Sequence, residues 1–143
     1  MTMKIRMIGY WMATSLIALE TLAGGVVDLT HGRTSVFSGP LVVDVITHLG
    51  YPVYILTILG LWKIPGAIVL LAPGLPRLKE WAYAGIFFEL TGAAASFVLH
   101  GDGARELIAP VILALLAVAS WALRPQSRML GALFPAMAAQ HAD

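Results

Sequence analysis

The sequence contains no cysteine, and only 12% of its 143 residues are charged. Without thiols, the chain can form no disulfide, no thiolate-bound metal or iron–sulfur centre and no thiol-based redox relay. Soluble domains carry roughly a quarter charged residues, so half that fraction leaves too little polar surface for a water-soluble globule. The net charge of +1 indicates no basic surface for nucleic acid. These absences favour a membrane protein with no nucleic-acid partner.

Apolar residues make up 59% of the chain and concentrate in four long stretches. Each stretch is long enough to cross a bilayer, which takes about 20 residues per helix. The prolines of Pro73-Gly74-Leu75-Pro76 separate the second stretch from the third, because proline cannot continue a helix. The sequence therefore predicts an all-α polytopic membrane protein, a four-transmembrane-helix bundle that forms one domain over residues 1–143. The expected helices cover residues 8–29, 51–72, 81–99 and 107–123.

Two shorter apolar segments lie outside these helices. Residues 41–49 form a brief apolar piece in the loop between the first and second helices. Residues 128–138 place apolar side chains near one helical face, which is consistent with either an interfacial helix or a frayed tail.

Positive charges are divided unevenly between the two sides of this bundle. Because loops rich in lysine and arginine stay in the cytoplasm, both termini are expected there, in a bacterial-type inner (cytoplasmic) membrane crossed several times. The cytoplasmic side would hold Lys4, Arg6, Arg77, Lys79, Arg124 and Arg128, and the outer side Arg33 and Arg105.

Three ionisable residues inside the predicted helices carry the strongest functional signal. A charge at mid-helix costs on the order of 3 kcal/mol on insertion scales, so it is retained where it finds a partner inside the bundle. Lys63 and Glu89 lie at the same depth, and Glu20 lies about one helical turn further out. We therefore expect one buried polar cluster in which Lys63 and Glu89 approach within about 4 Å.

Small residues flank both Lys63 and Glu89 at helical spacing. Transmembrane helices approach closely where small residues meet, so both charges are expected on packing faces. The small residues are Gly60, Gly66 and Ala67 around Lys63, and Gly85, Gly92, Ala93 and Ser96 around Glu89.

The contact between Lys63 and Glu89 has two interpretations. It could only tie two helices together, or it could line a pocket in which a lipophilic ligand meets fixed charge. Two carboxyl groups beside one lysine are not all comfortably ionised in a low dielectric, which suits them to proton transfer. We favour the pocket. Its candidate catalytic residues are Glu20, Lys63 and Glu89, and its candidate ligand-binding residues are Tyr54, Trp62, Tyr83 and Ser96.

Histidines expected on the outer side carry a weaker signal. No two of them have the short fixed spacing of a strong metal-ligand motif, so the pattern predicts no metal site. His31, His48 and His100 are its only weak candidates. A b-type haem is not expected, because no histidine lies deep in a span. The same side is expected to hold Asp28, Asp44 and Asp102.

Several motifs follow one another through most of the chain. They are Leu49-Gly50-Tyr51-Pro52, Lys79-Glu80-Trp81-Ala82-Tyr83-Ala84-Gly85, Leu90-Thr91-Gly92-Ala93-Ala94-Ala95-Ser96 and Gly101-Asp102. On these motifs the chain resembles the DoxX-like family of small four-helix membrane proteins. Members often carry aspartate where this chain has Glu89, and histidine where it has Phe97, so no role resting on that histidine is expected.

The resemblance implies a four-helix membrane fold. It also implies an association with quinol-linked oxidoreductase complexes and with membrane redox or detoxification systems, and a distant branch is similar to receptor-assembly chaperones. The first hypothesis is therefore a protein that binds a quinone-like molecule in a charged pocket, as an accessory or catalytic part of such a process. The second is a non-enzymatic helper that stabilises other membrane proteins, and the third is a cofactor-free membrane isomerase or lyase.

The expected partners follow from the first hypothesis. They are the lipid bilayer, a lipophilic small molecule, and a membrane redox partner or a second copy of the chain. No motif for a tightly bound cofactor is present, so a quinone is the candidate ligand, and any electron transfer would need a partner or the quinone itself.

Overall fold

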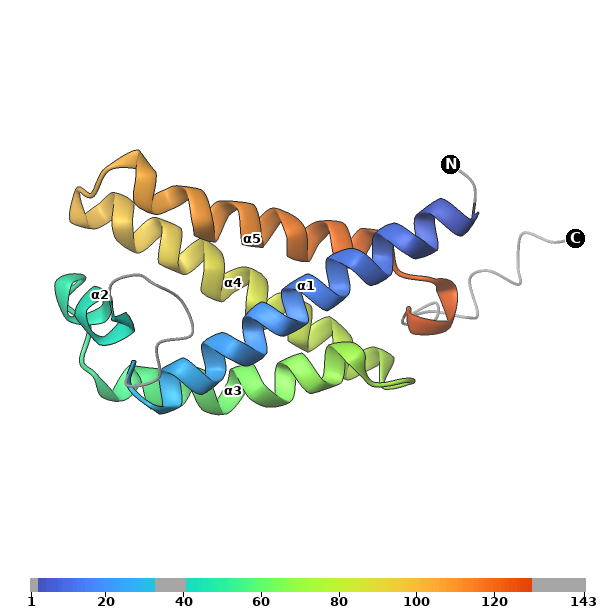
Figure 1. Cartoon of the computed structure of the whole chain (residues 1–143), viewed down its shortest axis with the longest axis horizontal. Helices are drawn as coiled ribbons and strands as arrows, with labels where there is room; N and C mark the ends of the chain where they lie inside the picture. Colours follow the sequence, from blue (N-terminus) through green and yellow to red (C-terminus); the bar gives the residue numbers. More distant parts are fainter. Residues whose placement is uncertain (1–2, 33–40, 130–143) are drawn as a thin grey trace, which may run out of the picture.

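The computed structural model describes residues 3–32 and 41–129, and within these ranges every element of regular secondary structure is a helix (Figure 1). The helices are α1 (Met3–Leu29), α2 (Val42–His48), α3 (Tyr54–Leu71), α4 (Pro76–His100) and α5 (Ala104–Ala122), followed by the short 3₁₀ helix η1 (Gln126–Arg128). Four of them, α1, α3, α4 and α5, are long and apolar enough to cross a membrane. The predicted all-α membrane fold with four spans is confirmed.

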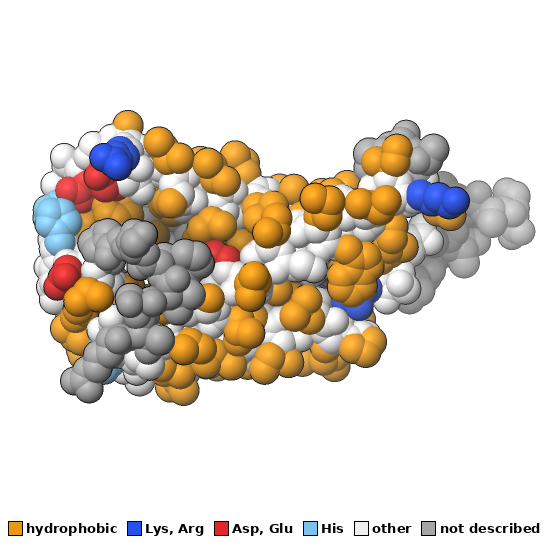
Figure 2. Space-filling model, in the orientation of Figure 1, with side chains coloured by type: hydrophobic (Ala, Val, Ile, Leu, Met, Phe, Trp, Pro, Cys, Tyr) orange, Lys and Arg blue, Asp and Glu red, His pale blue; other side chains and the backbone are white. Residues whose placement is uncertain are grey.

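The long helices run between two ends of the molecule, which we call the arginine end and the histidine end. At the arginine end α1 begins and α5 finishes (Figure 1), and the Arg6 guanidinium donates to the carbonyl oxygens of Ala122 and Arg124, both at 3.4 Å. The histidine end holds His48 and His100 where α2 and α4 finish. Hydrophobic side chains cover the middle of the face in Figure 2, whereas charged and histidine side chains gather toward its ends.

The bundle consists of two closely packed helix pairs. The contact of α1 with α3 is the most extensive, followed by that of α4 with α5, and smaller contacts join α1 to α5 and α3 to α4. Toward the histidine end α3 and α4 diverge, and α2 lies there (Figure 1). The buried core where the four long helices meet consists of Ile17, Ala18, Leu70, Tyr83, Ile86 and Ala117.

Two glycines allow α1 and α3 to approach closely. A Cβ atom added at Gly60 would lie 2.8 Å from the Gly25 carbonyl oxygen and 2.7 Å from Leu29 Cγ. A Cβ atom added at Gly25 would lie 2.9 Å from Lys63 Cβ. Side chains do not tolerate such separations, so any larger residue would push the two helices apart. This close contact sets Lys63 directly against α1.

The helices extend further than the apolar stretches indicate. α1 begins at Met3 rather than at residue 8, and α4 begins at Pro76 rather than at residue 81. Proline suits the first helical position, where its missing N–H would have no partner anyway. The chain enters α4 through Leu75 in a left-handed conformation, with φ of 55°. The charged residues Arg77, Lys79 and Glu80 therefore belong to α4, whose start hydropathy alone places later.

Two further segments differ from the sequence-based boundaries. The apolar stretch 41–49 contains α2, a helix that the sequence analysis did not predict. Of the tail segment 128–138, residues 130–138 lie outside the described residues, and Arg128 belongs to η1.

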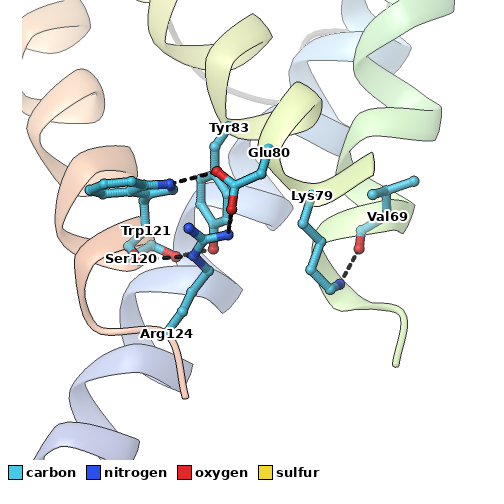
Figure 3. A network of polar contacts seen from close by, with 7 residues as sticks. All are labelled: Val69, Lys79, Glu80, Tyr83, Ser120, Trp121 and Arg124. Atoms are coloured by element: carbon cyan, nitrogen blue, oxygen red, sulfur yellow. Dashed lines mark hydrogen bonds and ion pairs between the residues drawn. The ribbon is translucent and has the colours of Figure 1, made fainter. Parts of the chain in front are cut away.

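Lys79 fastens the start of α4 to the end of α3 (Figure 3). Its side chain is fully buried, and its Nζ donates to the carbonyl oxygens of Val69, Leu70 (3.0 Å) and Ala72 (2.5 Å). The last carbonyls of a helix have no intrahelical partner, so the ammonium group satisfies them. Lys79 was expected among the loop charges of the cytoplasmic side. It is instead a buried part of the fold.

A second set of contacts joins α4 to the end of α5 (Figure 3). Arg124 Nη1 lies 2.7 Å from Glu80 Oε1, and Trp121 Nε1 donates to Glu80 Oε2 at 2.9 Å. One turn further along α4, the Tyr83 hydroxyl hydrogen-bonds the Ser120 hydroxyl at 2.7 Å. The polar residues of segment 79–83 thus close the arginine end of the bundle.

Candidate functional site

Lys63, on α3, contacts carboxyl groups from two other helices. Its Nζ lies 2.7 Å from Glu89 Oε1 on α4 and 2.8 Å from Asp28 Oδ2 on α1. The side chains of Lys63, Glu89 and Asp28 are 15%, 25% and 3% exposed, so the ion pairs are largely shielded. The predicted contact between Lys63 and Glu89 is confirmed, and one ammonium group joins three helices.

Asp28 corrects the sequence-based assignment of residues to the outer side. It lies within the bundle against Lys63 rather than among the outer loops, because Gly25 brings α1 close to α3 one turn earlier. A signal for this was present in the sequence. The spacing of three or four residues between Thr21, Gly25 and Asp28 places all of them on one helical face, and all are buried.

Glu20 lies beside the cluster but forms no ion pair with Lys63 in the part of the chain that the structure describes. A Cβ atom added at Gly24 would lie 3.5 Å from Lys63 Nζ and 3.7 Å from Glu20 Oε1, so both groups border this glycine. Glu20 is half-buried. The site therefore holds one ammonium group with two carboxyl groups in contact and a third nearby.

The pair of Lys63 and Glu89 stands between two cavities that separate α3 from α4. A cavity of about 440 Å³ extends from the pair toward the arginine end, and one of about 340 Å³ extends toward the histidine end. Both residues line both cavities, and α2 contributes to the wall of the second. Volumes of this size fall within the range of about 300–1,000 Å³ that is usual for small-molecule sites.

The walls of both cavities are mainly apolar. The first includes Trp62, Trp81 and Gly85, and the second includes Phe97 and Gly92. Acidic surface is visible between hydrophobic side chains in the middle of the face in Figure 2. A molecule in either cavity would thus meet an apolar lining with fixed charge at one wall.

The prediction that small residues bring another helix close to Lys63 and Glu89 is wrong in part. A Cβ atom added at Gly85 or Gly92 would have nothing within 4 Å, and the same holds for Gly66 beside Lys63. On the Lys63 face, Gly60 lies in close contact with α1, and Ala67 is fully buried. The small residues of α4 therefore leave space beside Glu89 instead of bringing another helix against it.

The four candidate ligand-binding residues do not gather at one place. Trp62 lines the first cavity and Ser96 the second, where the Ser96 hydroxyl hydrogen-bonds the Tyr51 hydroxyl at 2.8 Å. Tyr83 is buried against Ser120 and borders a separate apolar groove between α4 and α5. Tyr54, at the start of α3, is 67% exposed and is not among the residues that line these cavities.

The three histidines at the histidine end separate into two environments. His31 Nε2 lies 3.0 Å from the Thr57 hydroxyl. His48 Nε2 donates to Asp102 Oδ1 at 2.8 Å, and His100 Nδ1 lies 3.3 Å from Asp102 Oδ2. The hydrogen bond from His48 lowers the pKa of Asp102 below its ordinary value, which keeps this carboxyl ionised.

The arrangement around Lys63 can perform two kinds of chemistry. The ammonium group can donate a hydrogen bond to a carbonyl or hydroxyl oxygen of a bound molecule. The carboxyl groups outnumber the ammonium group, so one of them is available to give or take a proton.

Comparison with known proteins identifies a family. The model of the DoxX-like family matches residues 12–120 of this chain. No curated protein and no solved structure matches the chain. The matched range includes Asp28, Lys63 and Glu89, both cavities between α3 and α4, and the histidine cluster.

Proposed function

Since the chain belongs to the DoxX-like family, we propose that this membrane protein binds a quinone-like molecule beside Lys63 and Glu89. The molecule is lipophilic and carries a polar, carbonyl-bearing head. In this role the protein is an accessory or catalytic part of a redox or detoxification process in the inner membrane. Lys63 is the electrostatic partner of the bound head group, and Glu20 and Glu89 are the proton-handling groups.

The observation that carries the proposal is the position of the Lys63–Glu89 pair in the wall shared by two apolar cavities. A charge pair that only tied helices together would be surrounded by packed side chains. Here the neighbouring glycines of α4 face open space. Sites for small molecules combine an apolar lining with a few polar groups that fix orientation, which is the combination found at this pair.

Quinone chemistry needs both protons and electrons. Each two-electron reduction of a quinone to a quinol consumes two protons, which carboxyl groups at the head group can deliver. The electrons come from a membrane redox partner or from a quinol molecule, which is itself oxidised to the quinone and releases two protons.

Binding can be tested through the tryptophans of the first cavity. Trp62 and Trp81 both line it, so a benzoquinone with a decyl tail should quench tryptophan fluorescence saturably in the detergent-solubilised protein. The variant Asp28→Asn/Lys63→Met/Glu89→Gln removes the ammonium group together with the two carboxyl groups in contact with it. A hydrogen bond to a charged group contributes about 1.5–3 kcal/mol, so this variant should bind the quinone about ten to a hundred times more weakly.

The matched control is Lys4→Met/Glu106→Gln, which removes one exposed charge of each sign far from the cavities. It should bind as tightly as the unchanged protein. Equal affinity in the triple variant would show that the charge cluster does not hold the head group. Quenching that never saturates in the unchanged protein would exclude the quinone class and favour the helper hypothesis.

A further inference from the structure

A group of metal-ligating side chains gathers at the histidine end, away from Lys63. His48 is the last residue of α2, His100 is the last residue of α4, and Asp102 lies in the turn between α4 and α5. One nitrogen from each histidine and one oxygen of Asp102 all lie within 4.8 Å of one another. The two imidazole rings have their centroids 4.3 Å apart. Histidine and acidic surfaces are seen side by side at this end in Figure 2.

The donor set indicates the class of ion. Two imidazole nitrogens and one carboxylate oxygen are typical ligands of zinc and of neighbouring divalent transition metals. In a tetrahedral zinc site with bonds of about 2.0–2.1 Å, two ligand atoms lie about 3.3 Å apart. His48 Nε2 lies 2.8 Å from Asp102 Oδ1 and His100 Nδ1 lies 3.3 Å from Asp102 Oδ2, so small shifts of these side chains would bring one Asp102 oxygen and both nitrogens to this spacing around one ion.

Asp102 supplies a second, independent observation. Its Oδ2 atom is buried and has no hydrogen-bond partner among the described residues, although His100 Nδ1 is 3.3 Å away. A buried carboxylate oxygen without a partner carries a desolvation penalty that a bound cation would remove. The two histidine rings remain accessible, with side chains 53% and 39% exposed, so an ion can reach them from solvent.

We propose that His48, His100 and Asp102 bind one divalent transition-metal ion, with Zn²⁺ as the representative, and that water fills the fourth position. The ion cross-links the end of α2 to the turn between α4 and α5. Because Val42, Val45 and Ile46 of α2 line the cavity toward the histidine end, the ion also holds α2 over that cavity. The metal site does not rest on quinone binding at Lys63, although α2 borders a cavity that Lys63 also lines.

The test uses the full chain in detergent micelles, with any affinity tag removed and metal stripped by a chelator. Titration with Zn²⁺ alone, followed by calorimetry, should give one site per chain. His48→Gln and His100→Gln should each weaken binding at least tenfold. His31→Gln is the matched control, because His31 lies at the same end but bonds Thr57 instead. It should leave Zn²⁺ affinity unchanged.

Thermal unfolding gives a readout that distinguishes lost binding from lost folding. Glutamine can still donate a hydrogen bond to Asp102, so both glutamine variants should unfold at the temperature of the unchanged chain when metal is absent. Added Zn²⁺ should raise the unfolding temperature of the unchanged chain and of His31→Gln only. The proposal is overturned if all three variants bind Zn²⁺ equally, or if the unchanged chain shows no one-to-one site.

Discussion

One ammonium group, that of Lys63, faces the buried carboxyl group of Asp28 and the half-buried one of Glu89, from different helices. Replacing it by methionine leaves both without a cation, so we expect Lys63→Met to lower the free energy of unfolding by about 3–5 kcal/mol. Adding Glu89→Gln should restore only part of the loss, because Asp28 is 3% exposed and still unpaired. Adding Asp28→Asn as well should restore most of it. Unfolding of the detergent-solubilised protein by SDS measures these differences.

Lys4→Met is the control for this series, because Lys4 is exposed and its replacement should change stability little. If Lys63→Met/Glu89→Gln proves as stable as the triple variant, the Asp28 carboxyl group does not lower the free energy of unfolding when Lys63 is absent. If Lys63→Met alone is as stable as the unchanged protein, the ion pairs with Lys63 do not contribute to the free energy of unfolding.

The sequence was sufficient to predict one half of this cluster and not the other. Lys63 and Glu89 lie at equal depth in consecutive spans, so their meeting follows from helix length alone. Asp28 is one residue from the end of α1 and therefore reads as an interfacial residue. The shared helical face of Thr21, Gly25 and Asp28 indicates its burial, but its contact with Lys63 depends on how closely α1 approaches α3, which is a property of two helices.

At the scale of helices, the contact between α1 and α3 depends on Gly60. Gly60→Ala would set a methyl group 2.8 Å from the Gly25 carbonyl oxygen, so we expect a loss of about 1–3 kcal/mol in unfolding free energy. Gly66→Ala, on the same helix, has nothing within 4 Å of the added atom. It should leave stability unchanged or raise it by up to about 1 kcal/mol, because alanine favours helix.

The difference between the two alanine variants is best measured as the shift in thermal unfolding temperature under identical detergent conditions. Gly60→Ala should unfold at a lower temperature than Gly66→Ala. Equal unfolding temperatures would mean that α1 and α3 can move apart without lowering the stability of the bundle, and that their close contact is not required for stability.

Element boundaries show where sequence patterns lose information. The first and last residues of α3 and α5 are predicted to within a few residues, because apolar composition alone identifies a membrane span. The start of α4 was placed five residues late, since three of residues 77–80 are charged and this segment is held by the Lys79 and Glu80 contacts rather than by apolar burial. α2 has seven residues, too few for a periodic signal to distinguish it from a loop.

For the whole molecule, the excess of positive charge at the arginine end predicts that this end faces the cytoplasm. The chain has no cysteine, so single cysteines can be introduced without background. Arg77 and Asp44 are both exposed, at opposite ends of the bundle. In intact cells, an impermeant thiol reagent should label cysteine at position 44 and not at position 77. After the cells are permeabilised, both positions should react, which is the control for accessibility.

Labelling at position 77 but not at position 44 would reverse the orientation. The fold and the Lys63 cluster do not depend on that outcome, because they rest on contacts within the bundle. The histidine cluster shows the limit of sequence reasoning at this scale. His48 and Asp102 are separated by 54 residues, and only the arrangement of α2 against the α4–α5 turn brings them together.

The sharing of Lys63 among three helices also bears on how the chain is inserted during synthesis. α1 is made before α3 and carries Glu20 and Asp28 without a cation beside them, and a charge at the helix centre costs about 3 kcal/mol on insertion scales. The ammonium group of Lys63 arrives only with α3, two elements later. We therefore expect α1 to remain at the insertion machinery until α3 is made, so that Asp28 and Lys63 enter the bilayer as an ion pair. Glu89 then joins an ammonium group that is already inside the membrane. α4 can therefore enter the bilayer without waiting for a charge partner.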